Sequence, residues 1–170
     1  MATTYTLIDK SILTGTQTSV EFTGLGSYSS DYTDLLVKVS ARSARTNDAG
    51  GSDGKLEFNG STSGFSSRML LQQGGAYSGT SSTIFYFVNS DNSTSNTFGN
   101  MEVYIPNFSS SNYKSVSIDA VDENNATSAY GVLTAGLWSN TAAITSMKFT
   151  DNNGGFLATS SFYLYGIKNS

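Results

Sequence analysis

The stretch SFYLYGI, residues 161–167, carries apolar side chains on both faces of the strand that it predicts. Successive side chains of a strand point to opposite sides, so Phe162 and Leu164 share one face. The opposite face carries Tyr163, Tyr165 and Ile167. A surface strand of a two-layered β-protein alternates apolar and polar residues, because one face meets the core and the other meets water. Something must therefore cover each face of this strand.

The same period of two recurs along most of the chain, as in DLLVKVSARS (34–43), STIFYFVNS (82–90) and YKSVSIDAV (113–121). Ten or eleven strands are predicted, with no long helix and at most one short helical turn in SYSSDYTD. We expect residues 1–170 to form one all-β domain, an antiparallel β-sandwich of jelly-roll type with about ten strands. Residues 1–13 are expected to form an opening strand or an N-terminal arm.

The composition supports an all-β fold with many short loops. Hydrophobic residues make up 38% of the 170 residues, which is enough to bury a substantial core. Charged residues are only 13%, and Ser, Thr, Asn and Gly together account for 80 positions. These small residues disfavour helix interiors and supply turns and polar strand faces.

The absence of cysteine and histidine restricts the chemistry available to the chain. Without Cys there is no disulfide and no thiolate, and without His the commonest general base and metal ligand are missing. The 13 acidic residues could supply a catalytic pair, but no spacing singles out two of them. We therefore predict that the chain is not an enzyme and has no catalytic residues and no cofactor.

Charge and hydropathy exclude two further classes of partner. The net charge is −4 and the isoelectric point is near 4.6, whereas nucleic-acid binding needs clustered Lys and Arg. No run is long enough for a membrane-spanning helix, so no membrane partner is expected. The beginning, MATTYTLIDK, lacks the pattern of a signal peptide, which predicts synthesis and folding in a cytoplasm.

Two acidic loops offer oxygen atoms that a calcium ion could use. They are NDAGGSDG, with Asp48 and Asp53, and DENNAT, with Asp122 and Glu123. Neither matches the ligand spacing of an EF-hand loop, and Asp and Asn also form turns in hairpin loops. The turn interpretation is favoured and no metal site is predicted, although calcium stays open as an alternative.

Two explanations remain for the doubly apolar strands at 83–88 and 162–167. The outer face of each strand could be covered by the N-terminal strand or a long loop of the same chain, or it could meet another subunit. Large exposed apolar patches are rare on soluble monomers, and both explanations can hold together. The residues predicted to lie at a subunit or capsid interface are Tyr5, Leu7, Tyr86, Tyr104, Tyr163, Tyr165 and Ile167.

The tyrosines also leave room for glycan recognition. Ten Tyr and the single Trp138 could stack on sugar rings, as in lectin-like sandwiches. Most of these aromatic residues fall inside strands at a period of two, where packing in a core or interface is the commoner role.

Four stretches resemble a family of virion structural proteins from tailed phages, notably those that infect cyanobacteria and other marine bacteria. They are SVEFTGLGSYSSDYTDLLVKVSARS, LEFNGSTSGFSSRML, VYIPNF with YKSVSI, and SFYLYGI, in the same order along most of the chain. The segments YTDL and LYGI are the most distinctive. Members of this family look like capsid decoration (cement) proteins or fibre domains that are all-β and often trimeric.

The resemblance implies a noncatalytic structural protein that binds the outer surface of a capsid and stabilises the head. It further implies a homotrimer, with the major capsid protein as the second partner and the virion as the final location. The first alternative is a fibre or receptor-binding domain that recognises a glycan on the host surface. A weaker alternative is a free-standing carbohydrate-binding module.

Overall fold

The computed structural model describes residues 5–47, 52–72, 76–125 and 129–168, in which twelve strands and one short 3-10 helix follow one another. The strands are β1 (Tyr5–Ile12), β2 (Ser19–Phe22), β3 (Asp34–Ala41), β4 (Ser52–Phe58), β5 (Phe65–Gln72), β6 (Ala76–Ser81), β7 (Ile84–Val88), β8 (Gly99–Ile105), β9 (Lys114–Val121), β10 (Gly131–Trp138), β11 (Met147–Asp151) and β12 (Ser161–Ile167). The helix, η1, spans Leu25–Tyr28. No helix in these ranges is long and apolar enough to cross a membrane.

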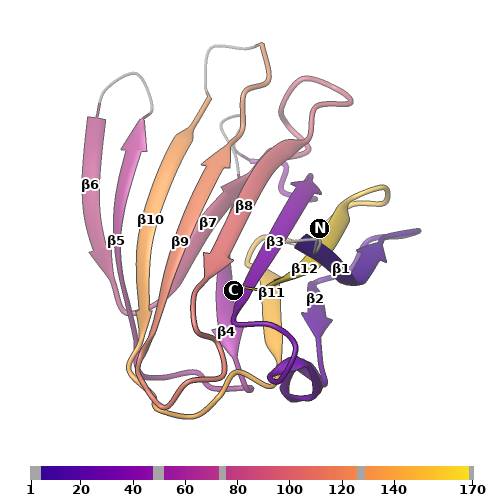
Figure 1. Ribbon diagram of the computed structural model, residues 1–170. Helices are drawn as coiled ribbons and strands as arrows, with labels where there is room; N and C mark the ends of the chain where they lie inside the picture. The colour runs from indigo at the N-terminus through magenta and orange to yellow at the C-terminus, as the bar shows by residue number, and fades with distance from the viewer. Residues whose placement is uncertain (1–4, 48–51, 73–75, 126–128, 169–170) are drawn as a thin grey trace.

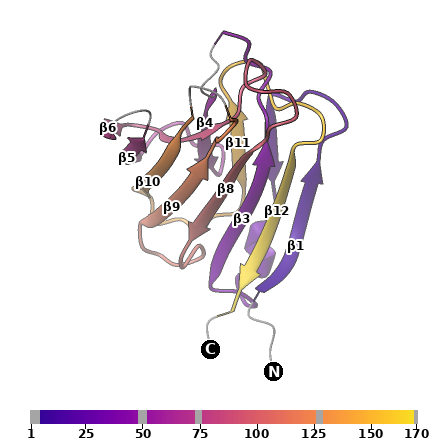
Figure 2. The same cartoon turned by 90° about the horizontal axis from the view of Figure 1, so that it is seen from above.

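The strands form two antiparallel sheets packed face to face (Figure 1). The larger sheet has the order β1-β12-β3-β8-β9-β10-β5-β6, and the smaller has the order β2-β11-β4-β7. Figure 2 shows β1 and β12 side by side at one end of the larger sheet, with β5 and β6 at the other end. The predicted all-β antiparallel sandwich is confirmed.

The chain passes back and forth between the two sheets in the manner of a jelly roll. With the β9–β10 hairpin set aside, the orders β2-β11-β4-β7 and β3-β8-β5-β6 are those of two interleaved Greek keys. The hairpin is inserted between β8 and β5, and β1 with β12 extends the larger sheet beyond β3. These additions make the larger sheet twice as wide as the smaller one, so the two sheets are unequal.

One core of apolar side chains fills the space between the sheets. Phe149 of β11 is fully buried in this core, with ring centroids 5.9 Å from Tyr86 on β7 and 5.7 Å from Phe162 on β12. Trp138 of β10 packs against Phe58 of β4 at 5.7 Å. The contacts Phe149–Phe162 and Trp138–Phe58 join the two sheets, whereas Phe149 and Tyr86 both belong to the smaller sheet.

The structure differs from the sequence-based expectation in two elements. The strand β6 was not predicted, because its sequence AYSGTS has no alternation of apolar and polar residues. The strand β1 does not lie over the outer face of β12, as one explanation of the apolar strands required. It pairs with β12 edge to edge, from Tyr5 opposite Ile167 to Ile12 opposite Ser161, with a bulge between Leu7 and Asp9.

Candidate functional site

The outer face of the larger sheet, which points away from the smaller sheet, is the most unusual surface of the described chain. Strand alternation sends one set of side chains into the core and the other set to this face. Seven large apolar side chains are exposed in the described chain, and six of them lie on the outer face. The six are Tyr5, Leu7, Ile12, Leu70, Val121 and Leu133.

Six of the seven predicted interface residues come together on one part of this face, here called the tyrosine patch. They are Tyr5, Leu7, Tyr104, Tyr163, Tyr165 and Ile167. Strand register explains the cluster, because Tyr5 pairs with Ile167 across β1 and β12, and Leu7 pairs with Tyr165.

Leu36 of β3 completes the tyrosine patch. Its cross-strand neighbours are Tyr165 on β12 and Tyr104 on β8. Leu36 is 4% exposed, although it points away from the core. Tyr163 and Tyr165 stay half-buried, and Tyr5 is 54% exposed. The patch therefore combines a buried apolar floor with accessible aromatic rings.

A buried carboxylate anchors one tyrosine of the patch. The hydroxyl of Tyr104 donates a hydrogen bond of 2.6 Å to Oδ2 of Asp34, and the backbone N–H of Asn107 donates to Oδ1 at 2.9 Å. Asp34 is 2% exposed. The hydrogen bond to Asp34, with a contribution from burial, raises the pKa of Tyr104 to about 12. Tyr104 is thus a fixed part of the patch, with its hydroxyl already engaged.

A charged pair borders the patch and shapes a hollow. Nζ of Lys38 lies 3.1 Å from Oε2 of Glu102, directly across β3 and β8. The hydrogen bond to Glu102 raises the pKa of Lys38. An open hollow of about 360 Å³ is lined by both residues together with Tyr5, Leu36 and Tyr165. Aromatic rings and paired charges around one hollow could contact a ligand that has both apolar and hydroxyl groups.

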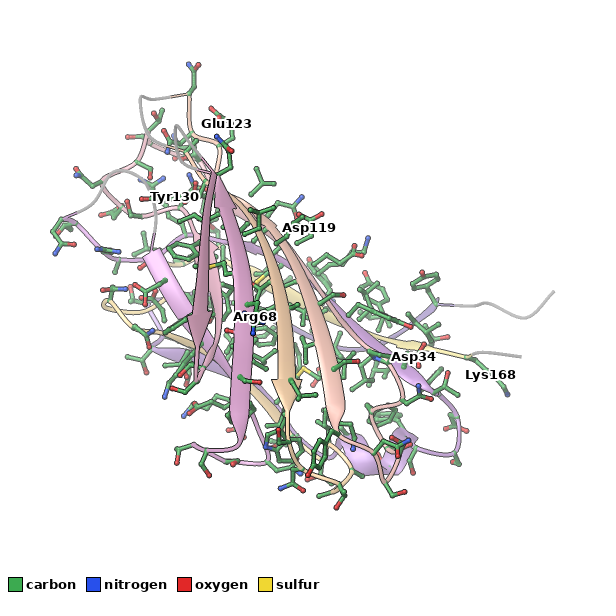
Figure 3. All side chains as sticks on the ribbon, turned by 90° about the vertical axis from the view of Figure 1, so that its left-hand side faces the viewer. Asp34, Arg68, Asp119, Glu123, Tyr130 and Lys168 are labelled. Atoms are coloured by element: carbon green, nitrogen blue, oxygen red, sulfur yellow. The ribbon has the colours of Figure 1, made fainter. Side chains whose placement is uncertain are left out.

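A second apolar region of the outer face was not predicted. Leu133 of β10 lies opposite Leu70 of β5, and their exposed fractions are 54% and 50%. Figure 3 labels two charged side chains of this half of the sheet, Arg68 on β5 and Asp119 on β9. The sequence of β10 contains the pattern that could have identified this region, because Leu133 follows the buried Val132 and must point to the opposite face. The predicted interface residues were mainly aromatic and did not include it.

Tyr86 corrects the prediction for the seventh interface residue. It is fully buried in the core, where its hydroxyl donates a hydrogen bond of 2.9 Å to the backbone oxygen of Thr150. Burial raises the pKa of Tyr86 well above its usual value. Both faces of β7 are apolar, so the alternation identified two faces without telling which one meets the core. Tyr86 has no surface to offer a partner, and its assignment to an interface was wrong.

Hydrogen bonds engage the acidic residues of both segments, and Asp53 lies in strand β4 instead of the predicted surface loop. The side-chain amides of Asn152 and Asn153 donate to the carboxylate of Asp53 at 3.0 and 2.9 Å. Oε1 of Glu123 accepts from the backbone N–H of Asn125, as in a turn. No group of three or more His, Cys, Asp or Glu residues in the described ranges could hold a metal ion. Asp48 lies outside the described residues.

Comparisons with known proteins add little to this geometry. No family model matches the chain, and no curated protein sequence matches it. A solved structure, described in connection with the cell entry of botulinum neurotoxin type C and its interaction with two ganglioside molecules, is similar over 89% of this chain. This chain spans 37% of that protein's chain, with 11% sequence identity and a TM-score of 0.27. A likeness at this TM-score carries no argument about fold or function.

Proposed function

We propose that the chain is a noncatalytic structural protein of a tailed-phage virion, bound to the outer capsid surface as a decoration protein that stabilises the head. Two lines of reasoning support the proposal. Four stretches of the sequence resemble phage virion structural proteins, and the exposed apolar residues gather on one broad sheet face. The second observation carries the proposal, because a wide apolar face suits contact between proteins better than the binding of a small substrate.

The proposed partners are other copies of the chain and the major capsid protein. The protein would be made in the host cytoplasm and would act on the outside of the virion. The outer face of the larger sheet is the proposed contact surface between copies, and loops at the ends of the sandwich are proposed to contact the shell. The homotrimer implied by the resemblance stays a prediction.

The experiment that tests this function is quantification of the chain in purified phage particles. A decoration protein should be present in hundreds of copies per particle, and particles that lack it should release their DNA more readily on heating. A fibre protein should be present at a small multiple of three, and particles that lack it should adsorb poorly but keep intact heads. Absence of the chain from particles would exclude both roles.

The second candidate is a fibre or receptor-binding domain that recognises a host glycan. The observation that favours it is the hollow between Tyr5 and Tyr165, where Lys38 and Glu102 could bond to hydroxyl groups. A glycan array probed with the purified chain tests this role, with Tyr165→Ala as the variant that should lose any signal. An array without binding would contradict both sugar-binding functions, including the free-standing carbohydrate-binding module.

A further inference from the structure

The outer face carries an ordered row of charges across neighbouring strands. Residues that lie directly opposite one another on neighbouring strands form a row across the sheet. In one such row Lys10 of β1, Tyr163 of β12 and Lys38 of β3 lie on the β1 side of the boundary between β3 and β8. Glu102 of β8 and Asp119 of β9 lie on the other side. The row therefore runs from positive to negative, with the change of sign at the centre of the six strands β1-β12-β3-β8-β9-β10.

The acidic half of this row is unfavourable within one chain. Glu102 and Asp119 are direct cross-strand partners, and like charges in that position destabilise a sheet. Lys38 is paired with Glu102, but Asp119 makes no ion pair with any residue in the described ranges. An external group that brings hydrogen-bond donors to this half would relieve the repulsion.

We propose that the group is a second copy of this chain, docked face to face about a two-fold axis that runs along the strands between β3 and β8. A rotation about this axis places β3 over β8 of the other copy, β12 over β9 and β1 over β10. Lys38 then faces Glu102 of the other copy, and Tyr163 faces Asp119 with its hydroxyl available as a donor. Each contact occurs twice, as in any two-fold interface.

The same axis matches several large side chains with small ones, whereas Leu36 faces Tyr104 and Lys10 faces Leu133 of the other copy. In the row next to the charges, Leu7 faces Ala135 of the other copy, and Tyr165 faces Ser117. In the row on the far side of the charges, Ile12 faces Gly131. Complementary shapes of this kind allow two sheets to approach closely. A shift of the axis to the line between β8 and β9 would instead place Glu102 opposite Asp119.

The area of the face is sufficient for a stable pair. Six strands at about 4.8 Å spacing and seven residues at about 3.4 Å rise cover roughly 700 Å². A standard protein interface buries about 800 Å² on each partner. The apolar contacts would supply affinity, while the charges fix the register and exclude other alignments.

The two-fold pair differs from the homotrimer that the resemblance implies. A three-fold ring joins two different patches of each subunit, whereas the charge row here is complementary to itself. The pairing is a property of the isolated chain and does not depend on a role in the virion. Its test can therefore fail while the proposed capsid function stands, and the reverse also holds.

The first measurement is the mass of the purified full chain by sedimentation equilibrium over a wide range of concentrations. The expected mass is twice that of the 18.0 kDa chain. The double variant Lys10→Glu with Lys38→Glu, and separately Glu102→Lys with Asp119→Lys, should each raise the dissociation constant at least about tenfold. Thermal unfolding of each variant as a monomer checks that the fold is kept.

Mixing the two reversed variants gives the decisive result. In one variant all charged residues of the row are acidic, and in the other all are basic. In a mixed two-fold pair, position 38 of each variant therefore faces an opposite charge at position 102 of the other. The mixture should regain the dimer that neither variant forms alone. A three-membered ring cannot alternate two kinds of subunit, so it would not be restored. The matched control is Lys38→Glu with Glu102→Lys in one chain, which keeps complementarity and should remain dimeric.

Three outcomes would overturn the pair. They are a wild-type mass of one chain at every concentration, a wild-type trimer, and a mixture of reversed variants that does not dimerise. If a monomeric wild type bound to capsids and both reversed variants lost that binding, the face would belong to the capsid contact instead.

Discussion

At the scale of single residues, Tyr104 and Asp34 form the clearest polar contact of the outer face. Replacing Tyr104 by Phe removes the only proton that this side chain donates, and the buried carboxylate of Asp34 loses one hydrogen-bond donor. Hydrogen bonds to charged groups contribute about 1.5–3 kcal/mol, so we expect Tyr104→Phe to lower the free energy of unfolding by about 2 kcal/mol. Urea denaturation at neutral pH measures this loss.

The same contact should depend on pH in one direction. The pKa of Tyr104 is raised to about 12 in the folded state from an ordinary value of 10.0. The contact's contribution is therefore complete below pH 10 and is lost as the pH rises from 10 to 12. The difference in stability between the wild type and Tyr104→Phe should shrink over that window. Tyr113→Phe, at a tyrosine that is 58% exposed, is the control, and an equal loss from that change would contradict a specific role for Asp34.

At the scale of elements, the glycine in the segment LYGI has a packing role. A Cβ atom at Gly166 would collide with the ring of Tyr32, which packs on β12 from the loop after η1. Overpacking of this kind costs about 1–3 kcal/mol, so Gly166→Ala should lower the midpoint of urea unfolding accordingly. Gly131→Ala on β10 is the matched control, because its nearest neighbour atom lies 4.0 Å away.

A double-mutant cycle identifies the cause of this loss. If the collision with Tyr32 is responsible, Gly166→Ala should cost much less in a Tyr32→Ala background. An unchanged cost in that background would show that the backbone of β12, rather than the ring, requires glycine.

A buried arginine organises the connection between β7 and β8. Arg42 is 5% exposed. Its guanidinium donates hydrogen bonds of 2.8–2.9 Å to four backbone oxygens, those of Asp91, Ser93, Thr94 and Thr97. A planar fork with five N–H donors can reach several acceptors at once, whereas a lysine ammonium concentrates its three donors at one point.

We therefore expect Arg42→Lys to destabilise the fold by about 2–4 kcal/mol, although the charge is kept. Arg68→Lys on the exposed outer face is the control, and it should change stability by less than about 0.5 kcal/mol. Chemical denaturation of the two variants side by side gives the comparison. Equal effects would mean that charge alone, without the geometry of the guanidinium, holds the connection.

Much of the strand pattern could be predicted because alternation is a local property. The buried Phe162 and Leu164 of β12 follow directly from it. Alternation could not tell which apolar face of β7 meets the core, so Tyr86 was assigned to the wrong side. It also could not find β6, whose pairing with β5 gives no apolar signal in the sequence.

At the scale of the whole molecule, the interface depends on strand order, which no local pattern contains. Lys10 and Asp119 are far apart in sequence, and they fall in one row only because β1, β12, β3, β8 and β9 are neighbours. The tyrosine-rich half of the face could be predicted from its aromatic residues. The charge row and the pairing of Leu70 with Leu133 became visible only with the order of the strands.

The two faces of β12 allow folding to be separated from assembly in one strand. Leu164 is fully buried, so Leu164→Ser should cost about 4 kcal/mol through a cavity and a buried hydroxyl, a large part of the 5–15 kcal/mol that stabilises a typical domain. Tyr163 is half-buried on the outer face, and Tyr163→Ser should cost about 1 kcal/mol while weakening self-association. Ile167 also lies on the outer face but is only 6% exposed, so Ile167→Ser should lower the free energy of unfolding more than Tyr163→Ser does. Circular dichroism and sedimentation on the three variants separate the effects, and unfolding of Tyr163→Ser would mean that the outer face is needed by the chain's own fold.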